Sequence, residues 1–77
     1  MWTTEAIDYK SIGSRMFDAI CSTGKSVEQF ARSIGISRGT VYDWIKGKNL
    51  PSTANLIRVK EEYAISIDWI LTGEGER

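Results

Sequence analysis

Residues 26–47 constrain the fold of this 77-residue chain more than any other segment. On both sides of Gly35, apolar residues recur at the three- and four-residue spacing of an α-helix. Glycine adopts the left-handed backbone of a sharp reversal at little cost, so the chain is expected to turn at Gly35. Ala31 stands mid-way along the first predicted helix, where a larger side chain would push the two helices apart. The segment therefore predicts two short helices joined by a tight turn.

Cap residues and apolar spacing predict three more helices and no strand. The expected helices cover residues 11–22, 26–34, 37–46, 52–63 and 67–71, and they begin at or just after Ser11, Ser26, Ser37, Ser52 and Ser66. Ser26 with Gln29 three residues later forms a capping-box pattern. The expected inward-facing residues are Ile12, Met16, Ala19, Ile20, Val27, Phe30, Ala31, Ile34, Ile36, Val41, Trp44, Ile45, Leu56, Ile57, Val59, Tyr63, Ile67, Ile70 and Leu71.

These elements predict an all-α fold, a compact bundle of about five short helices. We expect residues 1–10 to form an N-terminal arm or a short capping turn. Residues 11–72 are expected to form the folded domain, and the glycine-rich, charged residues 73–77 the start of a linker or a flexible tail.

Composition argues against an enzyme and against a membrane protein. The chain has no His, one cysteine (Cys21) and no phosphate-binding glycine loop, so we expect no catalytic site, no metal and no cofactor. No apolar stretch approaches the roughly 18 residues that span a bilayer, and no signal peptide is recognisable. A single small domain in the cytoplasm is expected.

The charge distribution favours an anionic partner for residues 25–48. The net charge of the whole chain is zero, but this segment holds five basic and two acidic residues, while the remainder holds five basic and eight acidic residues. Positive charge therefore gathers on the two-helix segment, as a surface that faces phosphates requires.

The two-helix segment has the pattern of a helix-turn-helix, in which the second helix can enter the DNA major groove with its N-terminal residues toward the bases. The predicted base contacts are Arg38, Gly39, Thr40, Tyr42 and Asp43. The Arg38 guanidinium can make a bidentate contact to a guanine or to a phosphate. Gly39 leaves room for close backbone approach, or is simply a weak helix position, and Thr40 contacts DNA or completes the cap of its own helix. Asp43 either accepts from the amino group of a cytosine or forms a local ion pair with Arg38 or Lys46, and we favour the ion pair.

Residues at the two ends of the motif are predicted to contact phosphates, which set affinity and register without reading sequence. They are Lys25, Ser26, Gln29, Ser37, Lys46, Lys48 and Asn49. Ser26 and Gln29 can combine capping with a phosphate contact. Trp69 has two interpretations: an exposed dimer or interdomain contact, or a core residue that packs near Tyr63.

Three groups of residues give the chain a family resemblance. They are Ala31 with Gly35, the run Trp44-Ile-Lys-Gly47 followed by Leu50-Pro51-Ser52, and the ending Ser66-Ile-Asp-Trp-Ile-Leu-Thr-Gly-Glu-Gly75. With them, residues 11–75 resemble the lambda-repressor-like helix-turn-helix domains, and among these the N-terminal domains of phage CI-type repressors.

That resemblance implies a dimeric transcriptional repressor that binds a palindromic operator in a bacterial host. Dimerisation is then expected through this domain or through a C-terminal domain that follows it in such repressors. Two features depart from the family pattern. Val27 and Arg38 stand where many relatives have a pair of glutamines, and the N-terminal segment is acidic where lambda repressor has a basic arm.

The predicted function is therefore sequence-specific DNA binding by the helix from about Ser37 to Lys46. The alternative is a protein-interaction module of the same fold, such as an antirepressor or an antitoxin-like protein. Arg38, Thr40 and the basic residues Lys46 and Lys48 favour DNA, because a helix that docks on protein more often exposes apolar anchors.

Overall fold

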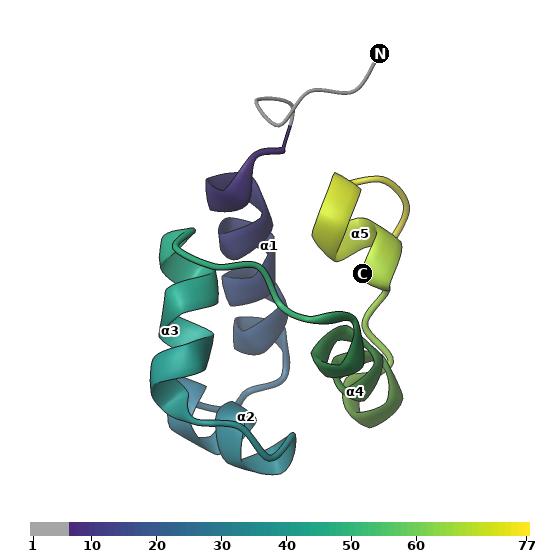
Figure 1. The fold of residues 1–77 in the computed structure, drawn as a ribbon. Coiled ribbons are helices and arrows are strands. Elements are labelled where there is room, and N and C mark those ends of the chain that lie inside the picture. The colour runs from purple at the N-terminus through teal and green to yellow at the C-terminus, as the bar shows by residue number, and fades with distance from the viewer. Residues whose placement is uncertain (1–6) are drawn as a thin grey trace.

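The computed structural model describes residues 7–77, which fold into five short helices with no strand among them (Figure 1). The helices are α1 (Tyr9–Ser22), α2 (Val27–Ser33), α3 (Arg38–Lys46), α4 (Thr53–Tyr63) and α5 (Ile67–Thr72). This architecture confirms the predicted all-α fold. Most of the predicted N-terminal arm, residues 1–6, lies outside the described residues.

Serine side chains begin four of the five helices, as predicted. Ser26, Ser37, Ser52 and Ser66 each accept a hydrogen bond from the backbone N–H three residues later. The capping box is complete, because the Gln29 side chain also accepts from the backbone N–H of Ser26 at 3.0 Å.

The predicted cap of the first helix is wrong. Asp8 caps α1, and Ser11 lies inside its first turn. The two Asp8 carboxylate oxygens accept from the backbone N–H of Ser11 at 3.0 Å and from its hydroxyl at 2.7 Å. A carboxylate that takes both hydrogen bonds satisfies more donors than a serine hydroxyl does, so the helix begins at Tyr9.

The turn between α2 and α3 has the geometry that Gly35 was expected to provide. Gly35 has a φ of +75°, in the left-handed region, and Ile36 donates its N–H back to the Ala31 carbonyl at 3.0 Å. This hydrogen bond ends α2 and redirects the chain, which lets α3 begin only a few residues later.

One buried cluster joins all five helices. It consists of Ile12, Met16, Ala19, Ile20, Phe30, Ala31, Ile34, Val41, Trp44, Leu56, Val59, Ile65 and Ile70. α1 packs along α3, with α2 against α3 and α5 against α1 (Figure 1). The predictions for Ile57 and Leu71 are wrong, since their side chains are 45% and 36% exposed. Leu56 and Val59 are three residues apart on the inner face of α4, so the residue after Leu56 points outward.

Candidate nucleic-acid interface

The exposed face of α3 is fixed by the burial of its opposite face. Val41 and Trp44 are 0% and 2% exposed, and they press the inner side of the helix into the core. The residues on the outer side therefore have to face solvent. Arg38, Tyr42 and Lys46 recur there every four residues, and all three are exposed. Gly39 is exposed beside Arg38.

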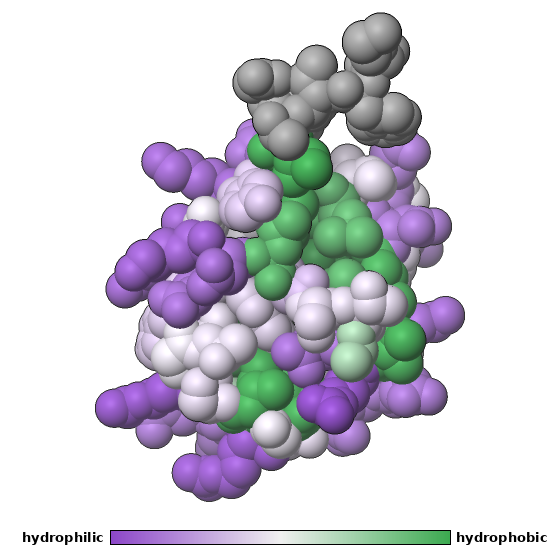
Figure 2. Space-filling model, viewed as in Figure 1, coloured by the Kyte–Doolittle hydropathy of each residue, from purple (hydrophilic) through white to green (hydrophobic). Residues whose placement is uncertain are grey.

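These four residues, Arg38, Gly39, Tyr42 and Lys46, form what we call the α3 stripe. Hydrophilic groups project along the side of the molecule where α3 lies (left in Figure 2). A stripe of this kind on the exposed face of a helix can enter a groove about as wide as a helix, such as the DNA major groove.

Thr40 and Ser37 are engaged with each other at the start of α3. The Ser37 hydroxyl accepts from the backbone N–H of Thr40 at 3.2 Å, and the two hydroxyl oxygens lie 2.9 Å apart. Of the two interpretations of Thr40, the structure thus contains the local cap. Thr40 is half-buried, so part of its side chain stays at the surface.

The ion pair predicted for Asp43 does not form. The only ion pair among residues 7–77 joins Arg38 to Glu28, with 3.0 Å between Arg38 Nη1 and Glu28 Oε1. Arg38 and Asp43 are five residues apart and so point about 140° away from each other around the helix. The hydrogen bond that involves Asp43 at the end of α3 is made by its backbone carbonyl, which accepts from the N–H of Lys48 at 2.9 Å.

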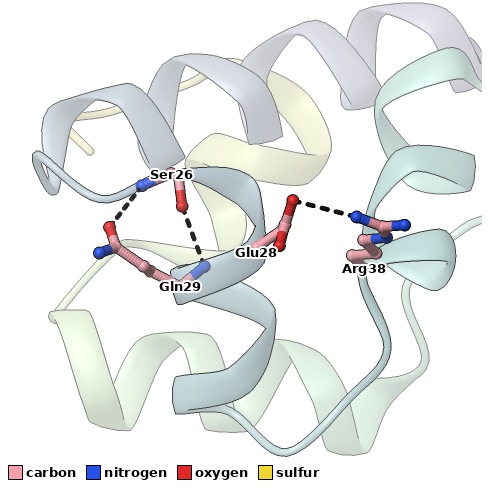
Figure 3. Close-up of polar contacts among 4 residues, drawn as sticks. All are labelled: Ser26, Glu28, Gln29 and Arg38. Atoms are coloured by element: carbon pink, nitrogen blue, oxygen red, sulfur yellow. Dashed lines mark hydrogen bonds and ion pairs between the residues drawn. The ribbon is translucent and has the colours of Figure 1, made fainter.

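Glu28 is the site residue that the sequence analysis missed. It is the second residue of α2, and Figure 3 shows its carboxylate directed at the Arg38 guanidinium across the turn. The sequence did contain a signal, because α3 opens with a basic residue and has no acidic residue in its own first turn. Together with Ala31, Arg32 and Ile36, the pair lines a shallow depression between the two helices.

Six of the seven predicted phosphate contacts lie in two groups, and the seventh, Ser37, caps the start of α3. Lys46, Lys48 and Asn49 are exposed at the end of α3 and in the loop that follows. Lys25, Ser26 and Gln29 are exposed at the start of α2. Figure 3 shows the capping box of Ser26 and Gln29 on the other side of α2 from Arg38, so these two residues are not brought together with the α3 stripe.

Trp69 is half-buried and packs against the core cluster. The Arg77 guanidinium lies over its ring, 5.4 Å from the ring centre. Tyr63 stacks instead on Phe30, with 5.1 Å between ring centres, and its hydroxyl contacts that of Ser33. The indole of Trp69 is thus partly covered by the core cluster and by Arg77, and the side chain stays partly exposed.

Within residues 7–77, no three His, Cys, Asp or Glu side chains gather as a metal site would require. In the same part of the chain, no helix is both long enough and apolar enough to span a membrane.

The fold and the α3 stripe define a class of protein, a helix-turn-helix domain whose second helix has one face exposed to solvent. A family model described as Helix-turn-helix matches residues 19–70, well over half of the chain. The chain therefore belongs to this helix-turn-helix family, whose members are DNA-binding regulators and not enzymes, as the composition predicted.

A curated relative and a solved structure support the same assignment. An uncharacterized HTH-type transcriptional regulator of Haemophilus influenzae is 39% identical over 46 residues, which cover 60% of this chain and 19% of that protein. This chain thus matches only about a fifth of its relative's length.

The P22 c2 repressor protein, in its crystal structure with synthetic operator 9T, superposes with a TM-score of 0.75. The match covers 82% of this chain and 96% of that one, at 19% identity. The predicted lambda-repressor-like fold, which the N-terminal domains of CI-type repressors share, is confirmed.

Proposed function

We propose that this chain is the sequence-specific DNA-binding domain of a CI-type transcriptional repressor of a phage or prophage, and that α3 reads the operator. The observation that carries the proposal is the α3 stripe, which Val41 and Trp44 hold outward by anchoring the opposite face of the helix. The basic charge of residues 25–48 supports it. So does the similarity in fold to the P22 c2 repressor, whose structure contains an operator.

In the proposed complex, the N-terminal half of α3 lies in the major groove. Arg38 donates two hydrogen bonds to the O6 and N7 atoms of a guanine. Gly39, Thr40, Tyr42 and Asp43 complete the base-facing surface. The Asp43 carboxylate can accept a hydrogen bond from the amino group of a cytosine, because no ion pair engages it in the described residues.

Phosphate contacts would fix the register of α3. Lys46, Lys48 and Asn49 flank its C-terminal end, and Ser37 lies at its N-terminal end. At the start of α2, Lys25 brings positive charge, and the Gln29 amide can donate because its capping role uses only its oxygen. The Ser26 hydroxyl lies at the same end of α2. These groups carry affinity but little sequence information.

A single domain covers one half-site, so we propose that operator binding requires a homodimer. Two copies would place their α3 helices in successive major grooves, roughly 34–36 Å apart, on a palindromic site. The second copy is held through this domain, where Trp69 is the proposed contact, or through a further C-terminal domain. A cytoplasmic location stays a prediction.

The test is selection from a pool of randomised DNA duplexes, at two salt concentrations, with sequencing of the retained fraction. Enrichment of a half-site or palindromic motif supports the proposal, and the spacing of the half-sites reports the dimer geometry. Salt-sensitive binding without any enrichment contradicts sequence reading by a single copy of this chain. No binding at low salt contradicts DNA binding altogether and favours the protein-interaction alternative.

A further inference from the structure

The ion pair between Glu28 and Arg38 is placed where it contributes little to folding. Both side chains are largely exposed, 57% for Glu28 and 67% for Arg38. Water screens such pairs strongly, and the entropy lost by two long side chains offsets much of the attraction. The effect of this pair is therefore expected on the orientation and the contacts of the Arg38 side chain, and not on stability.

The pair fixes a side chain that is otherwise poorly placed. A cation at the first residue of a helix is disfavoured by the helix dipole, and α3 has no acidic residue in its own first turn to compensate. The Glu28 carboxylate, from the first turn of α2, supplies that negative charge across the turn (Figure 3). It also restricts the orientation of the guanidinium before any partner arrives.

The geometry leaves the base-reading part of Arg38 available. Only Nη1 donates to Glu28, and within residues 7–77 neither Nε nor Nη2 donates to any group. These two nitrogens form one of the parallel edges with which a guanidinium binds a pair of acceptors. A guanine offers such a pair in O6 and N7.

We infer that Glu28 is a positioning residue, which orients Arg38 for guanine and keeps it from serving as a general phosphate contact. The inference rests on the proposed function. Glu28 has two effects on the complex. Its contact orders the Arg38 fork, which favours guanine over other bases, and its negative charge weakens the attraction of Arg38 for phosphates of any sequence.

The test compares Glu28→Gln with Glu74→Gln on the duplex that the selection yields. Glu28→Gln keeps an acceptor oxygen and removes the charge, whereas Glu74→Gln makes the same charge change in the exposed tail. The base pair that Arg38 reads is defined as the one whose preference Arg38→Ala abolishes. Binding is then measured by fluorescence anisotropy on four duplexes that differ at this base pair, over a salt series.

We expect Glu28→Gln to lower the preference for guanine at that base pair by about two- to fivefold, the range set by an exposed ion pair. Binding to random-sequence DNA should become tighter and more sensitive to salt. Glu74→Gln should leave the base preference unchanged. In the Arg38→Ala background, Glu28→Gln should have no further effect on base preference.

A Glu28→Gln variant with the wild-type preference for guanine would overturn the inference. So would a Glu28→Gln effect that persists in the Arg38→Ala background, because Glu28 would then act without Arg38. In both cases the proposed function would stand, since the wild-type protein would still select its motif. A wild-type protein that binds no DNA at low salt, or that enriches no motif as a dimer, would overturn both. Thermal unfolding of each variant verifies that the fold is intact.

Discussion

Gly13 of α1 lies directly against the backbone carbonyl of Trp44 in α3. A β-carbon built on Gly13 would stand 2.3 Å from the Trp44 oxygen, and 2.5 Å from the oxygen of Ile45. A real side-chain carbon does not approach an oxygen this closely, so α1 and α3 pack together only because residue 13 has no side chain. The contact fixes the position of the inner side of α3 against α1, and this holds the α3 stripe on the outer side exposed.

Replacement of Gly13 by alanine should therefore destabilise the fold. Helix propensity alone would favour alanine by about 1 kcal/mol. The added methyl group meets backbone atoms, which move only if α3 moves, and overpacking of this kind costs about 1–3 kcal/mol. We expect a net loss of up to about 2 kcal/mol in the free energy of unfolding, measured by urea denaturation followed by circular dichroism. A Gly13→Ala variant at least as stable as the wild type would contradict the close approach.

Gly13 also shows where prediction from the sequence ends. From the sequence alone it is a glycine in the first turn of the predicted helix 11–22, where it lowers helix propensity. Its role depends on Trp44, 31 positions later in the chain, and no local pattern connects the two. The ion pair between Glu28 and Arg38 is similar, because it forms only at the angle at which α2 and α3 meet.

Features set by near neighbours in the chain were predictable. The capping box of Ser26 and Gln29 and the turn at Gly35 involve residues a few positions apart, and both were expected. Even local reasoning failed where two caps competed, since Asp8 and Ser11 are both good N-cap residues and the choice depends on how many donors each satisfies. The residues proposed to contact DNA were chosen from the sequence, and they stay predictions.

The cap at Asp8 should make the stability of α1 depend on pH. Hydrogen bonds from the Ser11 hydroxyl and backbone hold the pKa of the Asp8 carboxyl below its usual value. The stabilisation is fully present above the pKa in the unfolded chain, about 3.9, and is lost as the pH falls through the lower pKa of the folded protein. Asp8→Asn caps without titrating. We expect the wild type to have the higher melting temperature at pH 7 and this advantage to shrink at pH 3. An equal difference at both pH values would contradict the role of the Asp8 charge.

Arg15 should hold α5 against α1. Its Nε donates to the Ile70 carbonyl at 2.8 Å and its Nη2 to the Leu71 carbonyl at 3.0 Å, at the end of α5. Arg15→Ala removes both hydrogen bonds, and we expect a loss of about 1–2 kcal/mol in the free energy of unfolding, with faster amide hydrogen exchange in α5. The control is Arg58→Ala, because the Arg58 side chain is exposed and hydrogen-bonds only to Asn55 in the described residues. If both variants lost equal stability, the hydrogen bonds of Arg15 to α5 would not account for the loss.

Gly39 offers the reverse of the Gly13 experiment. A β-carbon at Gly39 would meet nothing closer than the Ser37 hydroxyl oxygen, at 3.9 Å. Gly39→Ala should therefore leave stability unchanged or raise it by up to about 1 kcal/mol. If the Gly39 backbone approaches DNA closely in the proposed complex, the same variant should bind the selected duplex more weakly. A variant that is more stable and binds DNA as tightly as the wild type would place Gly39 outside the contact surface.

Arg38 and Lys46 lie eight residues apart on the α3 stripe, and the proposed function gives them different roles. Arg38→Ala should lose discrimination at one base pair, on the order of 1–3 kcal/mol, because no other residue replaces its paired donors. Lys46→Ala should weaken binding to all sequences alike and reduce the slope of log affinity against log salt by about 1. Both are measured by fluorescence anisotropy on the selected duplex and on random DNA. If the two variants reduced specific and random binding by the same factor, Arg38 would be a phosphate contact and the base-reading role would be wrong.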